Sequence, residues 1–271
     1  MENFHFEPAS LAQLAERHAP AFRDGAPFPH VIFDDFLPEA VLQGVLEEFP
    51  EPGEDAWRQR DLPHERKLGL SDETQMGPVT RHLLHELNGR VFIEFLESLT
   101  GIDGLIPDPH LLGGGLHQVL PGGLLKVHAD FNLHQRLGLE RRLNALLYLN
   151  RDWSDTYGGD LELWNRTMSR CERRVAPVFN RCVVFATSDS SFHGHPEPLS
   201  CPPGRSRRSI ALYYYTAPRQ GRPAAAHSTL FRARPDERVR TTSARRLARR
   251  LVPPLLADAV RSGRRRLGTR K

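Results

Sequence analysis

The side chains best suited to chemistry are His128 and Asp130, which lie two residues apart in the segment KVHAD. Residues i and i+2 of a β-strand project to the same face. One imidazole and one carboxylate on a shared face supply two ligands of the facial triad that binds non-haem Fe(II). A chain of this composition holds roughly 0.7 His-x-Asp tripeptides by chance. The pair alone therefore also fits a surface strand with two solvated polar groups.

A third ligand has to come from elsewhere in the sequence. His193 and His195 follow the apolar segment RCVVFAT and lie in SFHGHP. They are also two residues apart, so both would share one face of a strand. The spacing predicts that one of them completes the triad and leaves open which one.

A basic strand follows at RRSIALYYY, residues 207–215, where β-branched and aromatic residues favour a strand. Arg207 and Ser209 share one of its faces, and Arg208 lies on the other. A buried arginine is costly unless it is paired. The far carboxylate of 2-oxoglutarate would be a bidentate partner for Arg207, with Ser209 adding a hydroxyl bond. The alternative is an exposed arginine on an edge strand.

The elements that would position these residues differ between the two halves of the chain. Helical spacing predicts helices over residues 9–18, 38–49 and 79–100, with a strand and turn at 27–37 and a polar loop at 50–78. Beyond residue 105, short apolar segments alternate with Gly, Pro, Asn and Asp. This pattern predicts a β-sandwich or barrel.

Composition narrows the class of protein. The 271 residues are 39% hydrophobic and 26% charged, which predicts a soluble globular chain. No apolar segment approaches the roughly 20 residues of a transmembrane helix, and the N-terminus resembles no signal peptide. Three cysteines without metal spacing (Cys171, Cys182 and Cys201) indicate a reducing compartment, so we expect a cytoplasmic protein.

Positive charge is concentrated at the C-terminus. Residues 240–271 hold eleven basic side chains and a single acidic one, so the remaining chain is net acidic although the total is +4. Such a tail could contact an anionic partner, or it could be a solvated amphipathic segment. We expect residues beyond about Arg219 to be dispensable for metal and 2-oxoglutarate binding.

Several motifs in order resemble one known family. They are HAD at 128–130, LLYLNRDW at 146–153, GGDLEL at 158–163, PVFNRCVVF at 177–185, His193, and RRSI at 207–210. This order resembles the Fe(II)/2-oxoglutarate-dependent dioxygenases of the prolyl-hydroxylase type, and PFPHVIFDDFLP resembles the opening of bacterial members. The resemblance implies a mainly β fold with flanking helices, a double-stranded β-helix (jelly roll) with N-terminal supporting helices. It divides the chain into N-terminal support (1–105), a jelly-roll core (106–219) and the basic tail (220–271).

The same resemblance implies roles for individual residues. The Ser-Phe-His pattern favours His193 over His195 as the distal ligand. Relatives often have a cosubstrate-binding tyrosine before the metal motif, a place that His117 or Gln118 takes here. The implied metal-binding and catalytic residues are His128, Asp130 and His193. The implied cosubstrate-pocket residues are Arg207, Tyr148, Ser209, Gln118 and Asn144.

The activity implied is hydroxylation of an unactivated C–H bond of a prolyl, amino-acid or other small-molecule or peptidyl substrate. Its cofactors would be Fe(II), 2-oxoglutarate, O2 and ascorbate, with release of succinate and CO2. The alternatives are a non-oxidative, cupin-like metal enzyme with the same His/Asp/His set, and a binding protein that acts through its basic tail. Oligomeric state stays open, a homodimer included.

Overall fold

The computed structural model describes residues 4–218 and 225–237. The strongly basic residues 240–271 lie outside this range, so the predictions for the tail stay predictions. In the described residues the helices are α1 (Pro8–Arg23), α2 (Glu39–Glu47), α3 (Pro78–Leu87) and α4 (Arg90–Thr100), with short 3-10 turns at Glu73–Gln75 and Asp155–Tyr157. The strands are β1 (His30–Phe33), β2 (Arg58–Leu62), β3 (Glu65–Leu70), β4 (Ile106–Pro107), β5 (Gly115–Val119), β6 (Leu124–Ala129), β7 (Leu133–His134), β8 (Leu139–Tyr148), β9 (Leu161–Trp164), β10 (Cys171–Val175), β11 (Cys182–Ala186), β12 (His193–His195), β13 (Arg207–Thr216) and β14 (Leu230–Phe231).

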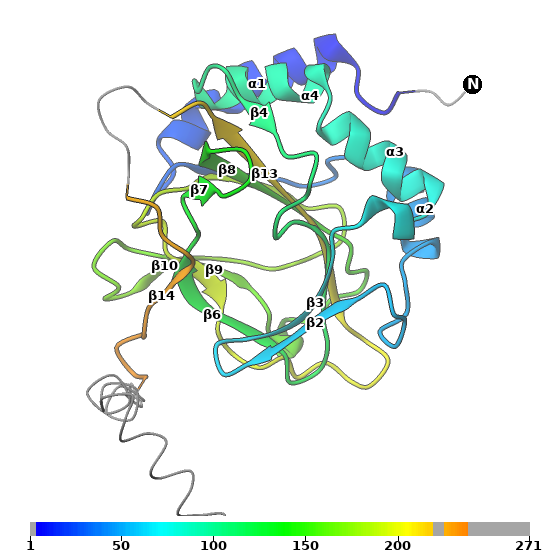
Figure 1. The fold of residues 1–271 in the computed structure, drawn as a ribbon, viewed down its shortest axis with the longest axis vertical. Coiled ribbons are helices and arrows are strands. Elements are labelled where there is room, and N and C mark those ends of the chain that lie inside the picture. The colour runs from blue at the N-terminus through cyan, green and yellow to red at the C-terminus, as the bar shows by residue number, and fades with distance from the viewer. Residues whose placement is uncertain (1–3, 219–224, 238–271) are drawn as a thin grey trace, which may run out of the picture. The chain divides into compact units, whose positions relative to one another are not determined.

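The named strands form one antiparallel sheet that curls on itself (Figure 1). Its order is β1-β11-β8-β13-β5-β3-β6-β12-β9-β10, with β14 paired to β6 and β2 paired to β3. The helices lie along one flank of the curled sheet, and its concave side faces the opposite way. The predicted mainly β fold with flanking helices is confirmed.

Strand alternation divides the side chains of the sheet between two environments. On β8 and β13, Leu147, Ile210 and Leu212 belong to the large core that also includes the buried leucines and phenylalanines of α2, α3 and α4. Tyr148 and its neighbour Val183 on β11 face the concave side and form a second, smaller core. Because successive residues face opposite sides of a strand, one face binds the helices and the other is free to build a pocket.

Two elements differ from the sequence prediction. The helix expected over 79–100 is broken into α3 and α4 at Asn88 and Gly89. A Cβ at Gly89 would lie 3.1 Å from the Glu86 carbonyl oxygen and 3.2 Å from that of His85, so the glycine relieves crowding in the turn between the two helices. The expected loop at 50–78 contains the β2–β3 hairpin. Every residue of β2 is exposed, so β2 has none of the apolar alternation by which a strand is recognised.

The sheet also extends past the predicted segment boundaries. Strands β1 and β3, from the segment predicted as N-terminal support, lie within the sheet beside β11 and β5. Strand β14, from the predicted tail, pairs with β6 so that Phe231 lies opposite His128. Main-chain pairing across the barrel therefore involves residues on both sides of 106–219. No helix in the described residues is long and apolar enough to cross a membrane.

Candidate metal centre

Three side chains converge on the concave side of the sheet. His128 lies near the end of β6, Asp130 directly follows that strand, and His193 begins β12. Strands β6 and β12 are antiparallel, with His193 directly opposite His128. The Asp130 carboxylate lies between the two rings, with each Nε2 atom 3.5 Å from one of its oxygens. Within the described residues, one ligand atom from each of the three lies within 4.8 Å of the other two.

Main-chain carbonyls hold both imidazoles in the orientation that a metal requires. The Nδ1 atom of His128 lies 2.8 Å from the Lys126 carbonyl oxygen, and that of His193 lies 2.9 Å from the Ser191 carbonyl oxygen. A carbonyl can only accept, so each Nδ1 carries the proton and each Nε2 presents a lone pair. Burial, opposed only in part by the Asp130 carboxylate, lowers the pKa of His193 to about 4. That ring is therefore neutral near pH 7.

Asp130 is fixed by two residues of β8. Its Oδ2 accepts a hydrogen bond of 2.8 Å from the Asn144 amide and lies 3.0 Å from Nη2 of Arg141. Arg141 in turn donates twice to the Asn144 carbonyl oxygen, at 3.0 and 2.7 Å. Burial by itself raises the pKa of the Asp130 carboxyl, but Arg141 and the two imidazoles outweigh it and hold that pKa well below its usual range. The carboxylate stays ionised although it is buried.

This donor set fits a divalent iron ion. Two imidazoles and one carboxylate, all on one side, match the facial triad of non-haem Fe(II) sites. The carbonyl bonds behind the two rings and the Asn144 and Arg141 contacts behind the carboxylate are the outer partners that orient such ligands.

A buried cation lies in the same pocket. Arg207 is 5% exposed, donates from Nε to the Gly159 carbonyl oxygen at 2.8 Å, and donates from Nη2 to the Tyr148 hydroxyl at 3.2 Å. No carboxylate of the described residues lies within ion-pair distance of Arg207. Ser209 is also buried in the pocket, directly opposite Tyr148 on the neighbouring strand. A desolvated guanidinium without a carboxylate partner is a site for an anionic ligand.

Of the residues predicted for the cosubstrate pocket, Gln118 does not line it. Along β5, His117 and Val119 line the pocket, whereas Gln118 lies on the opposite face, where its amide donates to Ser206 Oγ at 2.8 Å. Strand alternation therefore favours His117 at the place of the expected tyrosine. Asn144 does line the pocket, but its contacts are with Asp130 and Arg141.

His195 is the other histidine of the SFHGHP segment. It also lines the pocket, and its Nδ1 atom has no hydrogen-bond partner among the described residues. The strand is irregular between His193 and His195, and His195 lies opposite Leu125 rather than His128. The three-residue ligand group accordingly includes His193 and excludes His195.

Several residues that line the pocket were not predicted from the sequence. Arg60 and Lys67 reach the pocket from the β2–β3 hairpin, and both pair with Glu65, at 3.4 and 3.3 Å. Arg141 was not predicted because regular alternation along β8 puts Arg142, two residues before Asn144, on the pocket face and Arg141 on the other face. The register shifts opposite Tyr214 and Tyr215, and Arg141 faces inward instead. Thr229 reaches the pocket from the segment before β14.

Comparison with known proteins agrees with this geometry. The sequence model of the 2OG-Fe(II) oxygenase superfamily matches residues 114–215. No curated protein matches the sequence. Among solved structures, a prolyl hydroxylase from Trichoplax adhaerens, in complex with a peptide fragment of the hypoxia-inducible factor oxygen degradation domain, is 16% identical. That match has a TM-score of 0.56 and covers 76% of this chain and 91% of the other.

Two further prolyl 4-hydroxylases have similar folds. The Pseudomonas putida enzyme is 19% identical, with a TM-score of 0.51 over 73% of this chain and 98% of that one. The Phytophthora capsici enzyme is 20% identical, with a TM-score of 0.56 over 80% of this chain and 68% of that one. At these identities the likeness establishes the fold, which is the jelly roll that the family resemblance implied.

Proposed function

We propose that this chain, a 2-oxoglutarate-dependent dioxygenase by its 2OG-Fe(II) oxygenase domain at residues 114–215, hydroxylates an unactivated C–H bond of a small-molecule or peptidyl substrate. Succinate and CO2 are the products formed from 2-oxoglutarate. The observation that carries the proposal is a His/Asp/His ligand group that shares one pocket with Arg207, a buried cation to which no carboxylate is paired.

His128, Asp130 and His193 are the proposed iron ligands. Bound Fe(II) supplies the activation of dioxygen that couples oxidation of 2-oxoglutarate to oxidation of the substrate. Each Nδ1–H is bonded to a main-chain carbonyl, which orients the ring so that Nε2 is the atom turned toward the metal. Arg141 and Asn144 hold the carboxylate in place from the outer side.

Arg207, Tyr148 and Ser209 are the proposed anchor for the far carboxylate of 2-oxoglutarate. The guanidinium is held by Gly159 and Tyr148, which restricts its side chain before the ligand binds. Glycine suits that position because its φ is +80° and because a Cβ would lie 2.6 Å from Cδ2 of Leu199 and 3.0 Å from Cδ of Arg207. Leu146 and Leu161 line the inner wall of the pocket, and Val183 and Phe185 of β11 belong to the apolar cluster behind them, which keeps water out of that wall.

Substrate class rests on analogy. The Trichoplax adhaerens prolyl hydroxylase was solved with a peptide, which supports a peptidyl substrate as one candidate for this chain. Ascorbate enters the proposal only as an auxiliary reductant that keeps the iron in the Fe(II) state, because 2-oxoglutarate and the substrate supply the electrons of the reaction itself. Cytoplasmic location is likewise proposed, on the three free cysteines at positions 171, 182 and 201.

The test is an assay of succinate release with Fe(II), ascorbate and 2-oxoglutarate over a panel of prolyl peptides, free amino acids and other small molecules. We expect succinate formation that depends on Fe(II) and O2 and that is lost in Asp130→Ala. Arg208→Ala is the matched control, because the Arg208 guanidinium lies over the Phe49 ring on the opposite face of β13. Metal-dependent turnover of a panel compound without any consumption of 2-oxoglutarate would support a cupin-like enzyme instead and would contradict the proposal.

A further inference from the structure

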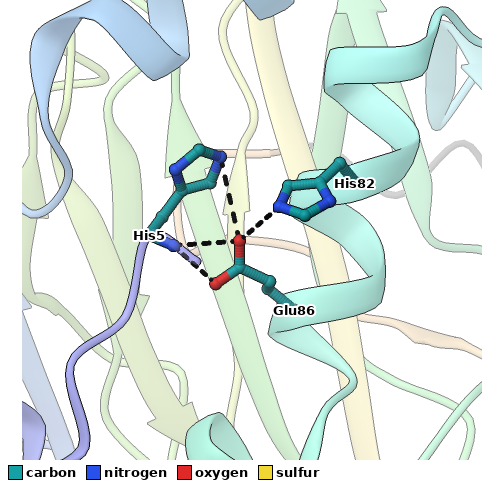
Figure 2. A group of neighbouring side chains, drawn as sticks. All are labelled: His5, His82 and Glu86. Atoms are coloured by element: carbon teal, nitrogen blue, oxygen red, sulfur yellow. Dashed lines mark hydrogen bonds and ion pairs between the residues drawn. The ribbon is translucent and has the colours of Figure 1, made fainter. Parts of the chain in front are cut away.

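A second cluster of potential metal ligands lies on the surface of α3, outside the barrel pocket (Figure 2). His82 and Glu86 are one helical turn apart, so their side chains share one face of the helix. His5 reaches the same place from the segment that precedes α1. Figure 2 shows both imidazoles directed at the carboxylate of Glu86.

The donor atoms converge closely. His82 Nε2 lies 2.8 Å from Glu86 Oε1, and His5 Nε2 lies 3.8 Å from the same oxygen. The two ring planes are almost perpendicular, with centroids 5.1 Å apart. One donor atom from each residue lies within 4.8 Å of the other two, as is also true of the three ligand residues in the barrel. The described residues contain these two groups and no third one.

Contacts other than those of the imidazoles hold His5 in position. The Glu86 carboxylate accepts the main-chain N–H of His5, at 3.0 Å for one oxygen and 2.8 Å for the other, and that of Phe6 at 3.3 Å. Phe6 is buried, with its ring 6.0 Å from that of Phe36 and 5.2 Å from that of Phe92. The third donor is therefore pre-positioned by main-chain bonds and by the core, so metal binding would order little additional chain.

We propose that His5, His82 and Glu86 bind a divalent transition metal of the zinc type, separate from the barrel site, and that the metal fixes the N-terminal segment to α3. Two imidazoles and one carboxylate suit zinc, nickel or cobalt, whereas calcium and magnesium prefer an all-oxygen shell. The side chains of His5 and His82 are 21% and 23% exposed, so the cluster lies at the surface, although the Nε2 atom of His82 is itself shielded from solvent.

The experiment is a titration of the full chain with Co(II) under anaerobic conditions, with bound metal counted after desalting and visible absorption recorded. We expect two equivalents in the wild type and one in His82→Ala and in His5→Ala. His85→Ala is the matched control. It removes another histidine of α3 that is paired with a carboxylate, Glu73, at 2.8 Å, but that has no third ligand nearby. This variant should keep both equivalents.

A second measurement separates the surface site from the barrel site. In a His128→Ala/Asp130→Ala background, Zn(II) should raise the melting temperature, because a ligand that binds only the folded state stabilises it. Adding Glu86→Gln should abolish that rise, although the glutamine carbonyl can still accept the His5 and Phe6 N–H groups. An equal Zn(II)-induced rise with and without Glu86→Gln, or one equivalent of Co(II) in the wild type, would overturn the proposal. Either result would indicate that Glu86 only anchors the N-terminal segment through its hydrogen bonds.

Discussion

His193 lies directly opposite His128 on the neighbouring antiparallel strand, and their ring centroids are 4.5 Å apart. Residues that are remote in the sequence thus become neighbours through main-chain pairing of β6 and β12. The position two residues further along, His195, lies past an irregularity in the strand and opposite Leu125. The pairing therefore distinguishes two histidines that sequence spacing alone treats as equivalent.

This pairing predicts different outcomes for the two histidines. His193→Ala should abolish stoichiometric Fe(II) binding at the barrel site, because only two of three protein ligands would remain. His195→Ala should keep that binding. Both can be followed by metal analysis of anaerobically loaded protein, in a His82→Ala background so that the proposed surface site does not contribute. Loss of iron in His195→Ala with retention in His193→Ala would show that His195, and not His193, is the distal ligand.

A second prediction concerns the buried guanidinium. Arg207→Ala should raise the 2-oxoglutarate concentration required for half-maximal binding by about 30- to 150-fold, since a charge-assisted bond is worth about 2–3 kcal/mol. Arg208→Ala should change it little, because that side chain lies on the other face of β13, over Phe49. Titration of 2-oxoglutarate into each variant measures the effect. An equal loss of 2-oxoglutarate affinity in the two variants would contradict the placement of Arg207 and Arg208 on opposite faces of β13.

The outer partners of Asp130 give a third prediction. Arg141→Leu and Asn144→Ala should each lower the affinity for Fe(II) by about 10- to 100-fold, the range seen when residues that orient metal ligands are replaced. Arg142→Ala is the control, since Arg142 lies at the register shift of β8 and donates to Thr216 Oγ1. Competition with a chelator gives the affinities. Unchanged affinity in Arg141→Leu would show that Asp130 does not need its ion pair with Arg141 to bind the metal.

A fourth prediction departs from the expectation that residues beyond about Arg219 are dispensable, because β14 pairs with β6. Phe231 pairs with His128 across β14 and β6, and its ring lies 5.5 Å from that of His128 and 4.1 Å from that of His64. Truncation after Arg219 should therefore lower both the melting temperature and the affinity for Fe(II). Truncation after Glu237 keeps β14 and should leave both unchanged. Identical behaviour of the two truncated chains would show that β14 contributes nothing to the site.

The attachment of that segment should depend on pH. His227 donates from Nε2 to Asp189 at 2.8 Å and from Nδ1 to the Ser228 carbonyl at 2.9 Å. Burial lowers the pKa of His227, but these bonds outweigh it and raise that pKa above 6.5 in the folded state. The stabilisation is therefore fully present below pH 6.5 and is lost as pH rises through the raised pKa.

Hydrogen-exchange protection of residues 225–237 measures this effect. Protection factors, corrected for the intrinsic rate at each pH, should fall from about pH 6 to about pH 9 in the wild type. In Asp189→Asn the fall should be smaller, because the charged partner of His227 is absent. A protection factor that is constant with pH in the wild type would contradict the role given to this ion pair.

The parts of the site that sequence could predict are those that depend on local geometry. Placing His128 and Asp130 on one face, or Arg207 and Ser209 on another, requires only the two-residue period of a strand. Gln118 was assigned to the pocket, although the same two-residue period places it on the other face. Leu116, two residues earlier, belongs to the core beneath the helices, so Gln118 faces that core as well.

Other features depend on long-range pairing and had no local signal. Arg141 faces the pocket only because β8 and β13 shift register. Lys67 lies on a strand whose pocket face also has the charged residue Glu65, so β3 and its exposed partner β2 resemble a polar loop. The apolar residues keep their helical spacing across the break between α3 and α4 at Gly89. The break could therefore not be predicted from that spacing.

The central claim is that the His128/Asp130/His193 group and Arg207 serve one bound molecule of 2-oxoglutarate. Anaerobic calorimetric titration of 2-oxoglutarate into the Fe(II)-loaded chain tests it without any knowledge of the substrate. We expect one equivalent to bind, with an affinity that falls when Fe(II) is omitted, when Asp130 is replaced by alanine, and when Arg207 is replaced by alanine, but not in Arg208→Ala. Binding of equal strength with and without Fe(II), or unaffected by Arg207→Ala, would contradict it.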